Sequence, residues 1–436
     1  MSVTAVACRL LGCLVLVLAR PVLAGGDYAA GDYKEGYETG NYATRSVALD
    51  TRANRARPAD LMQAFSQTPL GLPPVPVPDD NPATEARLAL GRKLFFDRRL
   101  SLNGTMSCAM CHVPEQGFAN NELALAVGME GRTVRRNAPT LYNVAYFKHL
   151  FHDGRENRLE QQVWLPTLAH NEMANPSVGE VLRKLGVLSD YRNLFEAAFD
   201  GRGPDMETVG AAIATYERAL VSGNSPFDRW RYGGEQDALD ASAKRGFALF
   251  TGKGGCVSCH LVGESTALFT DDDFHNTGIG WYASMQPGVT HRRVQLAPGV
   301  YQMVSTEIIA DVSNPVEGDV GRYEITGDPA DRWRYKTPTL RNVALTAPYM
   351  HDGSLQTLTD VVEFYNRGGQ PNPGQDPRVH PLGLTATEVS DLVAFLESLT
   401  GDNVETLVAD AFAAPIGDPG LGKPGDPVQR PAAPDE

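Results

Sequence analysis

The stretch PTLYNVAYFKHLFHDG (residues 139–154) occurs a second time as PTLRNVALTAPYMHDG (residues 338–353). The two copies align without a gap and share nine of sixteen residues. Self-similarity of this kind indicates that a structural unit is repeated along the chain. One difference is chemical: Phe151 of the first copy is Met350 in the second, and a thioether can bind a metal whereas a phenyl ring cannot. We therefore predict two related domains whose metal sites differ.

Each copy follows one C-x-x-C-H motif, CAMCH at 108–112 and CVSCH at 256–260. This motif attaches haem c covalently, because its thiols add to the haem vinyl groups and its histidine lies under the iron. A redox dithiol and a zinc site are the alternatives, but both motifs have the adjoining histidine and both open a repeated domain. We predict two haem c groups, with the attachment residues Cys108, Cys111, Cys256 and Cys259 and the proximal ligands His112 and His260.

Apolar residues recur at helical spacing in most segments between these motifs, and alternating strand patterns are scarce. Thr84 is the expected cap of a helix over residues 85–97. The predicted fold class is mainly α, with two tandem cytochrome c-like haem domains related by the internal repeat. The predicted boundaries are a signal peptide (1–24), a Gly/Tyr-rich and Pro-rich disordered lead-in (25–80), a first haem domain (81–235), a second haem domain (236–402) and a Pro/Gly-rich tail (403–436).

Bulk composition restricts the partners. The 436 residues have a formal net charge of −14, which argues against nucleic acid or an anionic membrane surface and is compatible with a basic protein partner. Arg9, a short apolar run and the small residues before Gly25 are typical of a cleaved secretory signal, and the run is too short to span a bilayer. We predict export to the periplasm. The Tyr-rich segment 25–45 is expected to be a flexible spacer rather than a radical relay.

Four phrases, LSLNGTMSCAMCHVPEQGFA, RRNAPTLYNVA, HNEMANP and TPTLRNVALTAPYMHDGSLQTL, resemble the bacterial dihaem cytochrome c peroxidase and MauG superfamily. The resemblance covers about residues 81–399. It implies that hydrogen peroxide reacts at the first haem and that electrons enter through the second. A small soluble cytochrome c or cupredoxin is the implied donor. An inter-domain calcium ion and a homodimer are implied as well.

The resemblance also assigns roles to individual residues. Met350 becomes the sixth ligand of the second haem iron, where MauG-type enzymes have a tyrosine. Glu172 matches the acid that moves a proton between the two peroxide oxygens, and Gln162 and Pro166 match residues that line the same pocket. Asn137 matches a calcium ligand of the family.

Two departures from the family pattern affect the mechanism. The loop VGMEG has Met129 where many of these peroxidases have a histidine that blocks the first haem. We predict an open first haem; the alternative is that Met129 or another residue caps it. His152 stands where the family usually has an inter-haem tryptophan, so His152 is a candidate for contact with a haem propionate or for packing between the haems.

The leading hypothesis is a periplasmic dihaem peroxidase. A MauG-like enzyme that oxidises residues of a partner protein is the first alternative, favoured by the missing histidine of the VGMEG loop. A non-catalytic dihaem electron carrier is the second, and it requires both irons to be six-coordinate.

Overall fold

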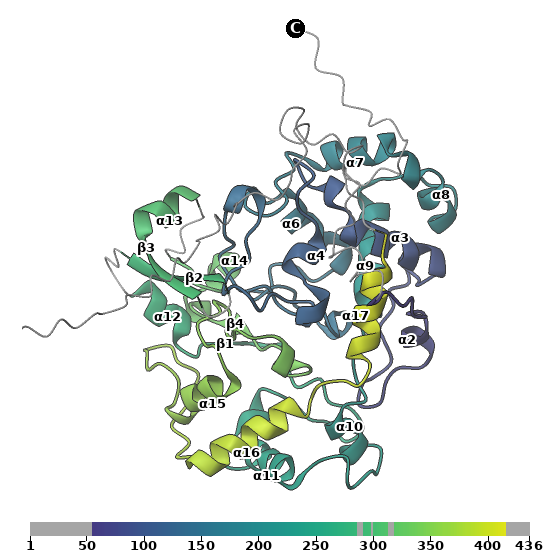
Figure 1. Ribbon diagram of the computed structural model, residues 1–436. Helices are drawn as coiled ribbons and strands as arrows, with labels where there is room; N and C mark the ends of the chain where they lie inside the picture. The colour runs from purple at the N-terminus through teal and green to yellow at the C-terminus, as the bar shows by residue number, and fades with distance from the viewer. Residues whose placement is uncertain (1–54, 286–290, 298–299, 313–317, 416–436) are drawn as a thin grey trace, which may run out of the picture. The chain divides into compact units, whose positions relative to one another are not determined.

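The computed structural model describes residues 55–285, 291–297, 300–312 and 318–415. The predicted signal peptide and the Tyr-rich segment lie outside the described residues. The described part is mainly α-helical, as the sequence predicts (Figure 1). Among the described helices, none is long and apolar enough to cross a membrane.

The helices fall into two series along the chain. The first series is α2 (Gln63–Ser66), α3 (Glu85–Phe96), α4 (Cys108–Cys111), α5 (Leu159–Gln162), α6 (Trp164–Leu168), α7 (Val178–Val187), α8 (Leu194–Ala198) and α9 (Met206–Ala219). The second series is α10 (Pro226–Arg231), α11 (Ala241–Thr251), α12 (Ile279–Ser284), α13 (Thr306–Val312), α14 (Tyr323–Thr326), α15 (Leu358–Asn366), α16 (Ala386–Glu397) and α17 (Val404–Ala413).

One helix crossing occurs in both series. In the first half (residues 81–235), α3 packs against α9; in the second half (residues 236–402), α11 packs against α16 (Figure 1). Each crossing needs a glycine, because a Cβ at Gly91 would overlap the Ala212 carbonyl and a Cβ at Gly246 would overlap the Asp391 carbonyl. The helix before each C-x-x-C-H motif is therefore held in the same way.

The caps of these helices follow the sequence. The Thr84 hydroxyl accepts a hydrogen bond from the Arg87 amide at 3.2 Å, so the predicted N-cap of α3 is confirmed. Asp240 caps α11 through a 2.7 Å bond from the Ala243 amide. Both side chains satisfy an amide that has no partner within the helix.

Two large hydrophobic clusters lie under these crossings. The first centres on Leu94, Phe95 and Tyr216 of α3 and α9. The second centres on Phe250 and Phe395 of α11 and α16. Each cluster includes partly buried side chains of its own C-x-x-C-H motif, so each motif rests on a separate apolar core.

Both predicted flanking segments are more ordered than expected. Residues 403–436 were predicted to be a tail, yet Val404–Ala413 form α17, and Leu407 and Ala411 are buried in the first-half core. Within the lead-in, Leu72 is buried and Val75 packs beside it. The physical reason is the same in both places: apolar side chains spaced among small or proline residues find a hydrophobic surface to cover.

The insertion of the second half contains the described β-structure. The phrase FTDDDFHNTGIG (residues 269–280) reads as loop in the sequence, but within it β1 (Phe274–His275) pairs antiparallel with β4 (Tyr335–Lys336). An antiparallel hairpin, β2 (His291–Ala297) with β3 (Val300–Ser305), lies between α12 and α13. The short β1–β4 pair brings the end of the insertion back to the second repeat copy.

Candidate active site

The first C-x-x-C-H motif forms a single helical turn, α4, so Cys108 and Cys111 lie on one side of it. His112 follows directly, and its Nδ1 lies 3.1 Å from the carbonyl oxygen of Phe118. A carbonyl can only accept, so Nδ1 carries the proton and Nε2 keeps its lone pair for a metal. Phe118 is fully buried, with a φ of 51°, and this backbone turn aims its carbonyl at the ring.

The second motif repeats this arrangement. Cys256 begins the short 3₁₀ helix η7 (Cys256–Ser258), and His260 Nδ1 lies 2.8 Å from the carbonyl oxygen of Phe269. Phe269 is also fully buried and has a φ of 53°. Burial lowers the pKa of both histidines, so both imidazoles are neutral at neutral pH. In both halves a fixed neutral imidazole offers Nε2.

The four cysteines are unpaired and half-buried. Burial raises the pKa of Cys111 to about 12 and that of Cys256 to about 11, so both remain thiols rather than thiolates. Two thiols on one turn, followed by a neutral imidazole with a free Nε2, fit the attachment chemistry of haem c.

Glu172 lies beside the first motif. Burial raises the pKa of this carboxyl, opposed by the Arg155 guanidinium, and the charge of Glu172 in turn raises the pKa of Cys111. The Glu172 carbonyl accepts a 2.9 Å hydrogen bond from the Met129 amide. A half-buried carboxyl with a raised pKa next to a cofactor attachment point is suited to proton transfer.

The other predicted pocket residues come from the segment that precedes Glu172. Gln162 ends α5, and Pro166 lies in α6. The Pro166 carbonyl accepts a 3.1 Å bond from the Met173 amide, which brings Pro166 close to the Glu172 loop. Gln162 is half-buried. The Met129 side chain is 2% exposed and belongs to the first-half core.

Arg155 is a residue of this site that the sequence analysis did not identify. Its guanidinium lies 3.6 Å from the centre of the Phe151 ring, in a cation–π contact. It also acts electrostatically on Glu172. The repeat contains the signal, because the position of Arg155 is Ser354 in the second copy. A charge present in one copy and absent from the other indicates a difference in function between the sites.

Residues 151–154 and 350–353, the first and second HDG loops, have the same backbone turn. Phe151 has a φ of 63° and Met350 has a φ of 73°, both in the left-handed region that L-residues rarely adopt. Gly154 and Gly353 also match, at 66° and 65°. Met350 therefore occupies the same place in its half as Phe151 does in the first half.

Tyr365 of α15 is a second residue that the sequence analysis did not identify. Burial raises its pKa, and the Cys256 and Cys259 thiols add to the rise, which places the phenol beside the second attachment site. A tyrosine oxygen is an established axial ligand of haem iron in proteins. In the sequence, Tyr365 stands in an amphipathic helix where an aromatic residue is indistinguishable from core packing.

The two HDG loops meet at a seam, which we define by two reciprocal hydrogen bonds. The backbone N–H of Asn137 donates to the backbone carbonyl of His351 at 2.7 Å. The backbone N–H of Lys336 donates to the backbone carbonyl of His152 at 2.8 Å. In the repeat alignment Asn137 corresponds to Lys336 and His152 to His351. The donors of the two bonds are thus equivalent positions of the repeat, and so are the two acceptors.

Ionic and aromatic contacts close the seam. Arg136 makes two hydrogen bonds to Asp319, at 2.9 and 2.7 Å, and a further one to Asp153; all three side chains are buried. Burial raises the pKa of Asp319, but the hydrogen bonds and charge of Arg136, together with His351 and the Gly321 amide, lower it below its usual value. His351 stacks on Tyr335, with the ring centres 3.5 Å apart. The Arg136, Asp153 and Asp319 side chains of the seam are thus buried and ion-paired.

His152 and Asn137, both predicted from the resemblance, lie at this seam. His152 Nε2 lies 2.8 Å from the Asn137 carbonyl oxygen and therefore donates to it. Burial lowers the pKa of His152 to about 3, so the ring is neutral at neutral pH. The Asn137 side-chain amide donates to the Ala124 carbonyl at 2.9 Å, which leaves its Oδ1 as the atom suited to a cation.

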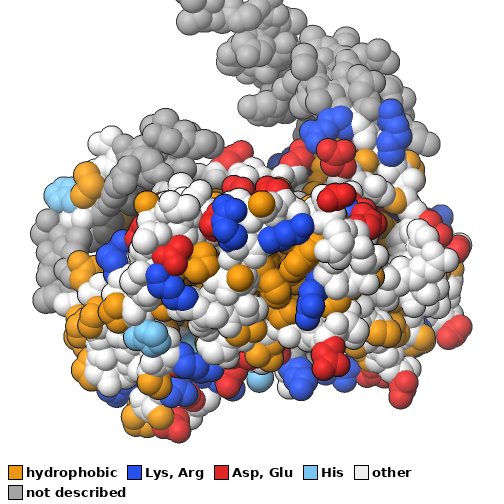
Figure 2. All heavy atoms as spheres, turned by 90° about the horizontal axis from the view of Figure 1, so that it is seen from below, with side chains coloured by type: hydrophobic (Ala, Val, Ile, Leu, Met, Phe, Trp, Pro, Cys, Tyr) orange, Lys and Arg blue, Asp and Glu red, His pale blue; other side chains and the backbone are white. Residues whose placement is uncertain are grey.

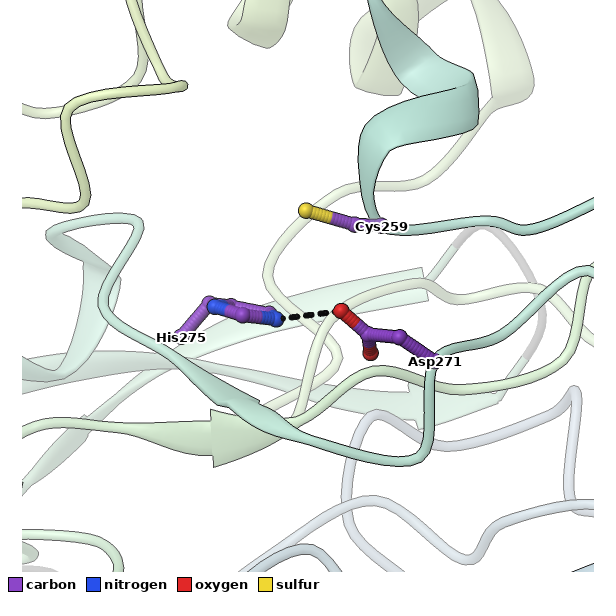
Figure 3. A group of neighbouring side chains, drawn as sticks. All are labelled: Cys259, Asp271 and His275. Atoms are coloured by element: carbon purple, nitrogen blue, oxygen red, sulfur yellow. Dashed lines mark hydrogen bonds and ion pairs between the residues drawn. The ribbon is translucent and has the colours of Figure 1, made fainter.

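Figure 3 shows a group at the second attachment site, Cys259, Asp271 and His275. His275 lies between two carboxylates, each at 2.8 Å, those of Asp271 and Asp376. Burial lowers the pKa of His275, but hydrogen bonds to Cys259 and Asp271 outweigh it and raise the pKa to about 9. Cys259 belongs to the second C-x-x-C-H motif, so the sulfur of this group is the one that the sequence assigns to haem attachment.

Comparison with known proteins places these features in a context. A profile described as "Di-haem cytochrome c peroxidase" matches residues 85–237. The chain is 40% identical over 340 residues to the cytochrome-c peroxidase IdrP1 of Denitromonas iodatirespirans, covering 76% of this chain and 86% of that protein. It is also 40% identical over 329 residues to the methylamine utilization protein MauG of Methylorubrum extorquens, covering 75% and 82%.

Solved structures agree. A MauG-like protein associated with microbial copper homeostasis matches with a TM-score of 0.63 and 30% identity, over 78% of this chain and 96% of that one. The diheme peroxidase BthA from Burkholderia thailandensis matches with a TM-score of 0.59 and 26% identity, over 74% and 87%. Peroxidases and MauG-type proteins are therefore both similar to this chain at comparable levels.

Proposed function

Because this chain belongs to the di-haem cytochrome c peroxidase family, it is a peroxidase-type oxidoreductase with haem c cofactors, and we propose that it reduces hydrogen peroxide in its first half. In this proposal electrons enter through the second half from a small soluble redox protein. The observation that carries the proposal is Glu172, a half-buried carboxyl of raised pKa beside Cys111.

The proposed chemistry divides between cofactor and chain. Haem bound at the first motif supplies an iron centre that accepts peroxide and exchanges electrons. Glu172 takes a proton from one peroxide oxygen and returns it to the other, which makes the departing oxygen a water. Arg155 is positioned by the Phe151 ring and favours the ionised form of Glu172. Gln162 and Pro166 line the pocket from α5 and α6.

We propose that the first haem is open in the oxidised protein. The supporting observation is the position of Met129, whose side chain is buried in the hydrophobic core and whose amide is held by the Glu172 carbonyl. A residue fixed in this way positions the Glu172 loop instead of acting as a removable cap.

The second half has two candidates for the sixth iron ligand. Met350, predicted from the repeat, has the special backbone turn of the HDG loop. Tyr365 lies beside the Cys256 and Cys259 thiols. A thioether favours the reduced iron and a phenolate favours the oxidised iron, so the identity of this ligand separates an electron-accepting peroxidase site from a site that stores oxidising equivalents.

Tyr365 is also the observation that favours the second candidate function, a MauG-like enzyme that oxidises residues of a partner protein. Sequence identity does not choose between the two functions, because IdrP1 and MauG are both 40% identical to this chain. Relatives of this chain are named cytochrome-c peroxidases, and this argues against a non-catalytic electron carrier.

The proposed electron donor is a small cytochrome c or cupredoxin in the periplasm. Figure 2 shows positive, negative and apolar side chains interspersed on one face of the protein, so on that face the net charge of −14 is not gathered into one acidic patch. Recognition there would combine weak steering with apolar contact. From the family resemblance we further propose that Asn137 Oδ1 binds calcium at the seam and that the protein forms a homodimer.

Low-temperature EPR of the oxidised holoprotein tests the ligand assignment. Wild type, Met350→Ala and Tyr365→Phe are compared. One high-spin and one low-spin ferric signal in the wild type is expected. Loss of the low-spin signal in Met350→Ala supports the peroxidase proposal, and its loss in Tyr365→Phe supports the MauG-like one. Two low-spin signals in the wild type would show a capped first haem, and an absence of peroxide turnover with any reduced donor would refute the peroxidase proposal.

A further inference from the structure

Glu217 of α9 is a buried carboxyl that the proposed chemistry does not use. The residue is 5% exposed, and its Oε2 is shielded from solvent without a hydrogen-bond partner. An unpaired carboxylate in this environment is costly, and the usual response is to bind a proton. Burial raises the pKa of Glu217 to about 8, with Arg218 opposing the rise and Glu160 adding to it.

The charges around Glu217 are already committed to other partners. Arg218, its neighbour on α9, pairs with Glu160 of α5 at 2.7 Å, and Glu160 also accepts a 3.0 Å bond from Asn81. On α3, Arg92 pairs with Asp410 of α17 at 2.6 Å. Both arginines are therefore paired with carboxylates other than Glu217, and the two remaining cations of α3, Arg87 and Lys93, bond Asn81 and Asp190.

Glu217 lies next to the first haem attachment point. After burial, its charge is the largest influence raising the pKa of the Cys108 thiol, and Glu172 acts on the same thiol more weakly. The first attachment turn thus has two carboxyls near it: Glu172 in the loop after α6, and Glu217 on α9.

The equivalent position of the second half is not acidic. Asn143 and Asn342 are equivalent in the repeat, and their amides donate to the carbonyls of Leu220 and Leu399 respectively. This register makes Glu217 equivalent to Leu396, and the glycine crossings of α3–α9 and α11–α16 give the same register. Leu396 is 7% exposed and belongs to the second-half core. The fold thus accepts an apolar side chain at this position, and the acid is particular to the first half.

We propose that Glu217 is the proton partner of the first haem: it takes up one proton from solvent when that haem gains an electron and releases it when the electron leaves. Reduction of peroxide, H₂O₂ + 2e⁻ + 2H⁺ → 2H₂O, consumes one proton for each electron. A group that binds a proton as each electron arrives keeps the charge of the buried site constant, and buried charge is expensive in a low-dielectric interior. Leu396 provides no such compensation in the second half.

The inference rests on the proposed role of the first half, but its test uses no peroxide, so the two can fail separately. The midpoint potentials of both haems in the holoprotein are measured against pH by spectroelectrochemistry. For the wild type, the midpoint potential of the first haem is expected to fall as the pH rises through the region around the Glu217 pKa of about 8. The midpoint potential of the second haem is expected not to change with pH in the same region. In Glu217→Gln and Glu217→Leu the first-haem potential is expected to be flat as well.

Glu180→Gln is the control, because its hydrogen bond with Arg183 on the surface of α7 lowers the pKa of Glu180 and its carboxyl is ionised throughout this range; it should keep the wild-type slope. An unchanged slope in Glu217→Gln, or a flat first-haem potential in the wild type, would overturn the proposal. If both variants fail to fold, infrared difference spectra of the wild type decide it: oxidation of the first haem should remove a protonated carboxylic C=O band, and a spectrum without that change refutes the assignment.

Discussion

In the first half, the HDG loop presents Phe151 under the guanidinium of Arg155; in the second half, the same backbone turn presents Met350, followed by Ser354 in place of the arginine. The histidine–carbonyl bonds and the glycine crossings, in contrast, are the same in both halves. The parts that we assign to holding a cofactor are thus kept, and the HDG loops differ. Under the proposed function, the difference teaches that one scaffold supports a reactive site and an electron-transfer site by changing a few side chains.

The largest expected effect is that of Glu172→Gln, which removes the proton carrier from the first half. Peroxide turnover should fall by about 10² to 10⁴-fold, because general acid–base catalysis contributes about that much. In the wild type the carboxylate form requires a pH above the raised pKa of Glu172, so activity should fall as the pH drops through that value. The Gln variant should lack this acidic limb, and the second-haem spectrum should not change. A turnover close to that of the wild type would show that Glu172 does not make the first half the reactive one.

Next in size is the loss expected from Arg136→Met at the seam. The substitution leaves the buried carboxylates of Asp153 and Asp319 without their cation, and breaking a buried pair costs about 3–5 kcal/mol. Denaturant unfolding of the holoprotein measures this loss. Arg183→Met is the control, because Arg183 pairs with Glu180 on the exposed surface of α7, and its loss should not change the unfolding midpoint. Equal effects of both substitutions would show that the seam adds no stability.

A spectroscopic exchange sharpens the comparison further. Phe151→Met puts a thioether on a backbone turn that already matches that of Met350, and Met350→Phe does the reverse. If this position faces the iron, the first variant should turn the high-spin EPR signal of the first haem into a low-spin one. Unchanged spectra in both variants would show that neither HDG loop reaches its iron, and Tyr365 would become the remaining ligand candidate.

The smallest expected effects come from the equivalent helix caps. Thr84→Ala and Asp240→Ala each remove the side-chain acceptor of one N-cap, on α3 and α11. Each should lower the free energy of unfolding by about 1 kcal/mol. Thermal unfolding of the two variants should give similar shifts. A large shift for one of them would show that the two crossings differ in stability.

The sequence predicts the features that local patterns encode. The C-x-x-C-H turns, the Thr84 cap and the repeat that relates Phe151 to Met350 are contiguous signals, and local chemistry determines them. Partners far apart in the chain are not encoded in this way. Arg136 and Asp319 are separated by 183 residues, and no periodic pattern links them.

The missed residues have their own physical reasons. Tyr365 is an aromatic residue in an amphipathic helix, where core packing is the ordinary explanation. Helix α17 precedes a Pro- and Gly-rich segment, which hides its apolar spacing. Arg155 was detectable only by comparing the copies position by position.

The reciprocal bonds of the seam have a consequence for how such a chain arises. Position i of one copy contacts position j of the other, and the converse contact is also made; this is the pattern of an isologous two-fold dimer. In a dimer of identical subunits, any substitution alters both sites at once. Once two copies are joined in one chain, the contact stays two-fold while each copy accumulates its own substitutions. The seam thus preserves the symmetry of the scaffold. The two halves differ in sequence at the equivalent positions Phe151 and Met350, and again at Glu217.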